Sequence, residues 1–136
     1  MLEKKLKILL IEDDRIEVLK LKRSIPQEFE GYTLTLANDG NEAFSILEKD
    51  SPDMILLDLN MPDTNGIEFL SIIKENEDLK HIPVVILTTS DSNKDIFECY
   101  KLGIAGYVLK PLKYEDYEQK IQTIIKYWSL NEFLKL

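Results

Sequence analysis

The sequence is poor in the residues that build the commonest metal and nucleophilic sites. It has one cysteine, Cys99, and one histidine, His81, in 136 residues. A single thiol cannot form an internal disulfide or a cysteine-rich metal site, which indicates a reducing compartment, the cytoplasm. A single imidazole argues against a multi-histidine zinc site and against a Ser-His-Asp triad. We expect Cys99 to be a small apolar helix residue and His81 to be an exposed loop residue.

Long apolar runs and glycine-rich loops are also missing. The early lysines precede only four apolar residues, 8–11, which are too few for a signal peptide or a membrane span. No glycine-rich dinucleotide fingerprint is present. Basic residues number 17 against 25 acidic ones, and the net charge is −8. Because phosphate backbones and anionic membranes repel such a chain, we expect no nucleic-acid partner and no membrane partner.

What the sequence does contain is a series of short strand-like runs separated by helical stripes. The run 54–57 is apolar throughout and 83–88 nearly so, as expected for strands buried on both faces of a parallel sheet. The expected strands are 6–11, 32–37, 54–57, 83–88 and 106–109. The expected helices are 15–25, 41–49, 67–76, a segment from Ser90 or Ser92 to about Gly103, and 116–127. The alternation predicts an α/β fold with a doubly wound, five-stranded parallel sheet of order 2-1-3-4-5.

We interpret residues 1–136 as a single domain, with a core at about 6–127 and an apolar tail at 128–136. The fourth expected helix places Ile96, Phe97 and Tyr100 on one side. Residues 61–66 are expected to be a loop, because Pro62 and Gly66 punctuate them.

Reactive side chains stand where the expected strands end, and ligands of open α/β sheets bind beyond these carboxyl ends. The residues are Glu12 and Asp13 after the first strand, Asp58 after the third, Thr88 at the end of the fourth and Lys110 after the fifth. Three carboxylates in one place repel each other unless a cation offsets them. Mg²⁺ prefers such oxygen ligands, and the backbone carbonyl of Asn60 would complete its shell.

A magnesium ion beside Asp58 suits phosphoryl chemistry. The ion lowers the repulsion between an incoming phosphoryl group and Asp58, whose carboxylate attacks phosphorus and becomes an aspartyl phosphate. Lys110 gives a compact positive charge to one phosphoryl oxygen, and Thr88 donates its hydroxyl to another.

In order and spacing, these residues resemble the receiver domain of two-component response regulators, and the chain is CheY-like in size. The matching segments are 10–14, 57–62 with Gly66, 87–90 and 106–111, and the likeness covers about residues 7–126. It implies that Asp58 accepts a phosphoryl group from a sensor histidine kinase or a histidine phosphotransfer protein. It also implies that the phosphorylated chain acts on a downstream protein, without being a turnover enzyme.

The resemblance implies further residue roles. Glu12 and Asp13 hold Mg²⁺, or Mn²⁺ in its place, with Asp13 the more direct ligand. Thr88 and Tyr107 form a switch pair. By family analogy, a kinase docks on Ile16, Leu19, Lys20 and Leu112.

A finer likeness concerns the segments 82–90 and 127–130. They resemble the stand-alone regulators that serve phytochrome-type kinases. Thr89 stands beside the phosphate where the family often has a smaller residue, and its bulk restricts access to Asp58.

Three alternatives stay open. Phosphatases of the haloacid-dehalogenase type also use a strand-end aspartate and Mg²⁺, but they normally carry an acid where this chain has Asn60. A receiver-shaped binding module that works without phosphorylation is a second alternative. The third concerns the tail, which either packs back onto its own chain or joins two chains in a homodimer.

Overall fold

The protein, described here by a computed structural model over residues 4–62 and 64–134, is an α/β fold around a parallel sheet. Its strands are β1 (Leu6–Ile11), β2 (Tyr32–Ala37), β3 (Met54–Leu57), β6 (Val84–Thr88) and β7 (Gly106–Leu109). The sheet order is β2-β1-β3-β6-β7. The predicted doubly wound sheet and its strand order are therefore confirmed. A small antiparallel hairpin, β4 (Asn60–Met61) and β5 (Thr64–Asn65), lies where a loop was expected.

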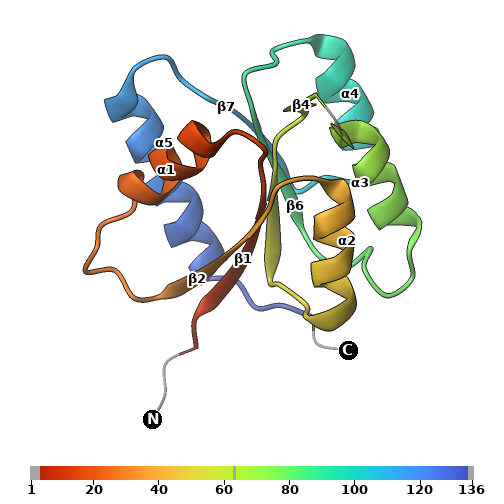
Figure 1. Cartoon of the computed structure of the whole chain (residues 1–136), viewed down its shortest axis with the longest axis horizontal. Coiled ribbons are helices and arrows are strands. Elements are labelled where there is room, and N and C mark those ends of the chain that lie inside the picture. Colours follow the sequence, from red (N-terminus) through yellow and green to blue (C-terminus); the bar gives the residue numbers. More distant parts are fainter. Residues whose placement is uncertain (1–3, 63, 135–136) are drawn as a thin grey trace.

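Helices cover both faces of the sheet (Figure 1). They are α1 (Arg15–Ser24), α2 (Gly40–Lys49), α3 (Gly66–Glu75), α4 (Asn93–Lys101) and α5 (Tyr114–Ser129). Helices α1 and α5 lie on one face, and α2, α3 and α4 lie on the other. Successive side chains of a strand point to opposite faces of the sheet, so each strand contributes apolar side chains to both layers. In β1, Ile8 and Leu10 face the α1/α5 side, and Leu9 and Ile11 face the other side.

Side-chain caps decide where four of the helices begin. Asp14, Asp39, Asn65 and Ser92 each accept a hydrogen bond from a backbone N–H of the first turn. The cap of α4 is thus Ser92 and not Ser90. The side of α4 on which Ile96, Phe97 and Tyr100 were expected is not its buried side: Phe97 and Tyr100 are more than half exposed, and Cys99 is the buried residue of the helix.

The end of the chain folds back onto the molecule. Helix α5 runs to Ser129, and beyond it Phe133 packs on Trp128, with ring centroids 6.3 Å apart. Both rings border the apolar layer under α1 and α5. Leu130 and Leu134 stay exposed, and the last two tail residues lie outside the described part.

Among the described residues, no helix is long and apolar enough to span a membrane.

Candidate functional site

The pleat of the strands sorts the predicted site residues between the two faces of the sheet. Glu12, Asp58 and Lys110 each stand two positions after a residue that faces the α1/α5 layer, namely Leu10, Leu56 and Val108. Alternation along the chain therefore directs these three charged side chains to one side. Thr88 stands two positions after Ile86, which faces the opposite layer, and Tyr107 packs against that layer too.

A buried ammonium group lies at the centre of the charged side. The Nζ atom of Lys110 is 3.0 Å from Glu12 Oε1, 3.0 Å from Glu17 Oε1 and 3.5 Å from Asp58 Oδ2. Glu12 and Asp58 are 3% and 7% exposed, so water screens these interactions poorly. The sequence analysis brought Glu12, Asp58 and Lys110 together, but it missed Glu17.

Hydroxyl and amide groups occupy the other side of Asp58. The side-chain amide of Asn60 donates hydrogen bonds to Thr88 Oγ1 at 3.1 Å and to Thr89 Oγ1 at 2.9 Å. The backbone N–H of Asn60 donates to Asp58 Oδ1 at 3.1 Å, which closes a local turn after the strand. Asn60 thereby links Asp58, through its backbone N–H, to both threonines, through its side-chain amide. The sequence analysis did not assign this role to Asn60.

Ser90 connects Thr88 to Tyr107. Its backbone N–H donates to Thr88 Oγ1 at 3.3 Å, and its carbonyl accepts a hydrogen bond from the Tyr107 hydroxyl at 2.8 Å. Its own hydroxyl donates to Asp95 Oδ2 at 2.6 Å, which ties the segment to the first turn of α4. A movement of Thr88 would therefore reach Tyr107 and α4 through a single residue.

Burial and charge shift the ionisation of the charged side. Burial, reinforced by Asp58 and opposed by Lys110, raises the pKa of Glu12 from its ordinary 4.5 to about 7. Burial alone would lower the pKa of Lys110, but the Asp58 and Glu12 carboxylates outweigh it, and the pKa is raised. The ammonium thus stays charged at neutral pH, while Glu12 lies near its midpoint.

The oxygen donors at this end of the sheet fit a hard divalent cation in their chemistry. Asp13 is exposed directly after buried Glu12, and Asp58 follows β3, the strand that pairs with β1. The carboxylates of these residues and the backbone carbonyl of Asn60 are the ligand types that Mg²⁺ prefers. Within residues 4–62 and 64–134, however, no three acidic, histidine or cysteine side chains are grouped as a ready metal site. Lys110 lies between Glu12 and Asp58 instead.

Gly66 leaves room for the backbone that carries Asp58. A Cβ atom at Gly66 would lie 2.9 Å from Leu59 Cα and 3.1 Å from the carbonyl oxygen of Asp58. We expect Gly66→Ala to lower the free energy of unfolding by about 1–3 kcal/mol, because backbone atoms must shift. Urea unfolding measures this loss.

Gly106→Ala is the matched control for Gly66→Ala. Its nearest neighbour would be Val85 Cγ1 at 4.0 Å, an ordinary contact. We expect that variant to unfold within about 1 kcal/mol of the parent. Equal losses in the two variants would contradict the packing argument.

The residues predicted to dock a kinase lie beside the charged side. Ile16 and Leu19 on α1 are 74% and 56% exposed, and Leu112 is fully exposed after β7. Lys20 is half-buried, with its Nζ 4.3 Å from the centroid of the Tyr117 ring. Three apolar side chains are thus open to solvent here.

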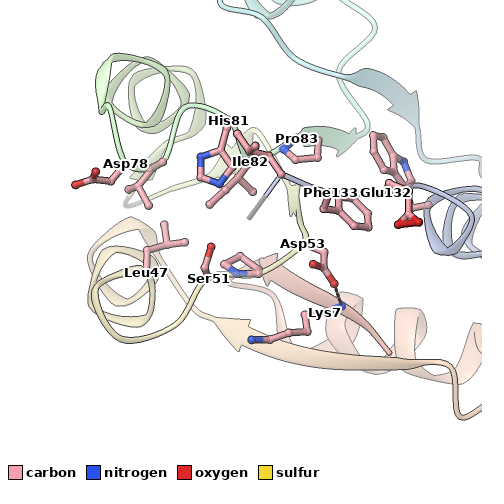
Figure 2. Close-up of a pocket in the computed structure, with 14 residues that line it drawn as sticks. Lys7, Leu47, Ser51, Asp53, Asp78, His81, Ile82, Pro83, Glu132 and Phe133 are labelled. Carbon is pink, nitrogen blue, oxygen red and sulfur yellow. Dashed lines mark hydrogen bonds between the residues drawn. The ribbon is translucent and has the colours of Figure 1, made fainter. Parts of the chain in front are cut away.

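A separate cleft, drawn in Figure 2, is lined by Asp53 and Pro83, the residues that precede β3 and β6. It therefore lies at the amino ends of the strands, whereas Asp58 follows the carboxyl end of β3. Its volume is about 560 Å³, and Lys7, Asp53, His81 and Phe133 are among the residues that line it. His81 is half-buried rather than exposed, and its Nδ1 has no hydrogen-bond partner among the described residues. None of the predicted site residues lines this cleft.

Two of the interactions that the sequence analysis missed, those of Glu17 and of the Asn60 side chain, involve residues whose positions in the sequence could have indicated them. Glu17 is an acid in the first turn of the helix that follows Glu12, and Asn60 stands two residues after Asp58. Ser90 carried no comparable sign, because its backbone groups make the two bonds that link Thr88 to Tyr107.

Comparison with known proteins gives matches over nearly the whole chain. The family model of the response regulator receiver domain matches residues 8–122. The chain is 37% identical over 129 residues to the probable methanogenesis regulatory protein FilR2 of Methanothrix harundinacea, covering 89% of this chain and 82% of that protein. It is 34% identical over 128 residues to response regulator Rcp1 of Synechocystis, covering 89% of this chain and 87% of Rcp1.

Solved structures agree with this sequence likeness. The phosphorylated cyanobacterial phytochrome response regulator RcpA superposes with a TM-score of 0.88 and 32% identity, over 96% of this chain and 99% of that chain. The Mn²⁺-bound form of Rcp1 superposes with a TM-score of 0.84 and 33% identity, again over 96% and 99%.

Proposed function

Because this chain belongs to the response regulator receiver domain family, we propose that it accepts a phosphoryl group on Asp58 and signals by a phosphorylation-dependent change of protein partner. The observation that carries the proposal is the contact of 3.5 Å between Lys110 Nζ and Asp58 Oδ2, two residues 52 positions apart. A buried carboxylate beside a buried ammonium, with Thr88 on its other side, supplies a nucleophile and two groups that bind phosphoryl oxygens.

The donor is a phosphohistidine of a sensor histidine kinase or a histidine phosphotransfer protein in the cytoplasm. An oxygen of Asp58 forms a bond to phosphorus while the phosphorus–nitrogen bond breaks, and the imidazole leaves with the electron pair and takes up a proton. Lys110 holds one phosphoryl oxygen by its ammonium group, and Thr88 donates its hydroxyl to another. Thr89 restricts the approach to Asp58, because its hydroxyl is held next to that of Thr88 by Asn60.

Glu12, Asp13, Asp58 and the carbonyl of Asn60 would hold the Mg²⁺ ion that the reaction requires. When bound, the ion offsets negative charge on the carboxylates and on the incoming phosphoryl group. Mn²⁺ is a possible substitute, and the Mn²⁺-bound form of the relative Rcp1 supports a divalent cation of this kind. This chain has no general acid at Asn60, which disfavours a phosphatase of the haloacid-dehalogenase type.

The output passes through Thr88, Ser90 and Tyr107. A phosphoryl oxygen draws the Thr88 hydroxyl towards Asp58, and the hydrogen bonds of Ser90 transmit the movement to the Tyr107 ring. The surface that changes is formed by α4, β7 and α5, where a downstream protein binds. The kinase-docking surface is formed by Ile16, Leu19, Lys20 and Leu112. A homodimer would form through the tail, where Leu130 and Leu134 are exposed.

The test is phosphorylation by acetyl phosphate in the presence of Mg²⁺, followed by intact mass. We expect one added phosphoryl group on the parent protein and none on Asp58→Asn, because an amide is a much weaker nucleophile than a carboxylate. No adduct and no consumption of acetyl phosphate would favour the module that works without phosphorylation. Steady consumption without an adduct, abolished by Asp58→Asn, would indicate a phosphatase or a very short-lived phosphorylated state.

A further inference from the structure

We propose that Glu17 is a positioning residue that holds the Lys110 ammonium group towards α1 and thereby slows the phosphorylation of Asp58. The inference rests on the proposed function. A lysine ammonium group has three N–H donors. The ammonium group of Lys110 is surrounded by three carboxylates, those of Glu12, Glu17 and Asp58. The distances to Glu12 and Glu17 are 3.0 Å each, and the distance to Asp58 is 3.5 Å. The ammonium group is therefore held more closely by the two glutamates than by the phosphoacceptor.

The capping of α1 explains why the Glu17 carboxylate is available. Glu17 is the third residue of α1 after the cap Asp14, a position from which glutamate normally accepts a hydrogen bond from the N–H of the cap residue. Here the Asp14 N–H donates to Glu12 Oε2 at 3.2 Å instead. Glu12 thus replaces Glu17 in the cap, and the Glu17 carboxylate reaches Lys110, a residue 93 positions away.

The surroundings of Glu17 keep its carboxylate in place. Its second oxygen, Oε2, lies 4.0 Å from Lys20 Nζ, one turn further along α1. Lys20 in turn lies over the ring of Tyr117, which is buried at 1% exposure. The Glu17 side chain is only 23% exposed. The Lys110 ammonium donates a charge-assisted hydrogen bond to Glu17, of a kind roughly twice as strong as a neutral one, and Lys20 adds a longer ion pair.

This contact competes with the reaction at Asp58. In phosphorylation by acetyl phosphate, an Asp58 oxygen bonds to phosphorus, the bond from phosphorus to the acetate oxygen breaks, and acetate leaves with the electron pair. The charge on the transferring oxygens is stabilised by an N–H of Lys110 that points at them. Each N–H that stays on Glu17 is withheld from the phosphoryl group. A weaker contact with Glu17 lets Lys110 approach Asp58 and speeds the transfer.

Two substitutions weaken the contact in different ways. Glu17→Gln keeps the shape and loses the charge, whereas Glu17→Asp keeps the charge and is one methylene too short to reach Lys110. With acetyl phosphate, Mg²⁺ and intact mass against time, we expect both variants to be phosphorylated about fivefold faster than the parent. Glu77→Gln is the control, because Glu77 is an exposed acid that pairs with Lys80 and lies away from the site. We expect its rate to equal that of the parent.

Comparing Glu17→Gln with Glu17→Asp distinguishes two effects of Glu17 on the rate: its contact with the Lys110 ammonium group, and the repulsion between its negative charge and the anionic phosphoryl donor. If Glu17→Gln were faster while Glu17→Asp matched the parent, charge alone would be responsible, and the proposal would be wrong. Rates of both variants at or below the parent rate would also overturn it, while an Asp58 adduct on the parent would leave the proposed function intact. No adduct on any of the proteins would overturn the proposed function and this inference with it. Unfolding curves of both variants identify any loss of folded protein.

Discussion

Lys110→Met is expected to lower the free energy of unfolding by about 3–5 kcal/mol at neutral pH, because it leaves buried carboxylates without their cation. Glu12 and Asp58 are almost inaccessible to water, and Lys110 is the ion-pair partner of both. A methionine fills a similar volume but offers no charge. Urea unfolding in EDTA at pH 7.5 measures the loss.

The same substitution should have a smaller effect in acid. Lys110 lowers the pKa of Glu12, so its removal lets Glu12 take up a proton at a higher pH than in the parent. At pH 5.5 Glu12 is protonated in both proteins, so the loss of Lys110 leaves one fewer charged carboxylate without a cation, and the variant should recover part of its stability.

The rate of phosphorylation of Lys110→Met by acetyl phosphate should fall by about a hundredfold, as expected when a preorganised charge is removed from a transition state.

Lys120→Met provides the control for this charge. Lys120 donates to the carbonyl of Leu109 at 2.9 Å from an exposed position on α5, so it lies near Lys110 in the fold but makes no ion pair with the buried acids. We expect that variant to unfold within about 0.5 kcal/mol of the parent, as is usual for surface substitutions. A Lys110 variant as stable as the Lys120 variant would contradict the proposed role of the buried ammonium group.

Glu12 should make the protein less stable as the pH rises. Its pKa is about 7 in the folded protein against an ordinary value of 4.5, so between these limits the folded state binds a proton that the unfolded state has lost. Unfolding is therefore favoured with rising pH, and the contribution of Glu12 falls by about 3 kcal/mol from pH 4.5 to pH 7. Above pH 7 it is constant.

Glu12→Gln removes this proton linkage. In EDTA, we expect the free energy of unfolding of the variant, relative to the parent, to rise by about 3 kcal/mol between pH 4.5 and pH 7 and then to level off. Glu77→Gln changes the net charge equally at an exposed position and is measured beside it. Parallel curves for the parent and Glu12→Gln over this range would show that burial does not raise the pKa of Glu12.

Local patterns in the sequence were enough for most of the fold. The run from Met54 to Leu57 is buried throughout and ends at Asp58, as its unbroken apolar character predicts. The pattern was less informative for α4, where apolar spacing placed Phe97 and Tyr100 on one side of the helix, but these residues are exposed and the buried residue is Cys99. Apolar spacing shows that a helix has a favoured face, but only packing against the sheet decides which side chains are covered.

The chemical types at the strand ends were also readable from the sequence. Asp58, Thr88 and Lys110 follow or end apolar runs, and the strand order then brings them to one end of the sheet. The pleat of the strands further separates Thr88 from the two charged residues. The pleat depends on periodicity along a strand, whereas the strand order was inferred from the alternation of strands and helices along the chain.

The sequence by itself therefore determined the strands, their order and the residue types that gather around Asp58. Only the tertiary structure decided how these residues pair: Lys110 divides its ammonium between Glu12, Glu17 and Asp58, which precede it by 98, 93 and 52 positions. It also decided that Asn60 bonds to the hydroxyls of Thr88 and Thr89. Such contacts depend on how helices and loops pack on the sheet, to within the length of a hydrogen bond, and no local pattern carries that distance.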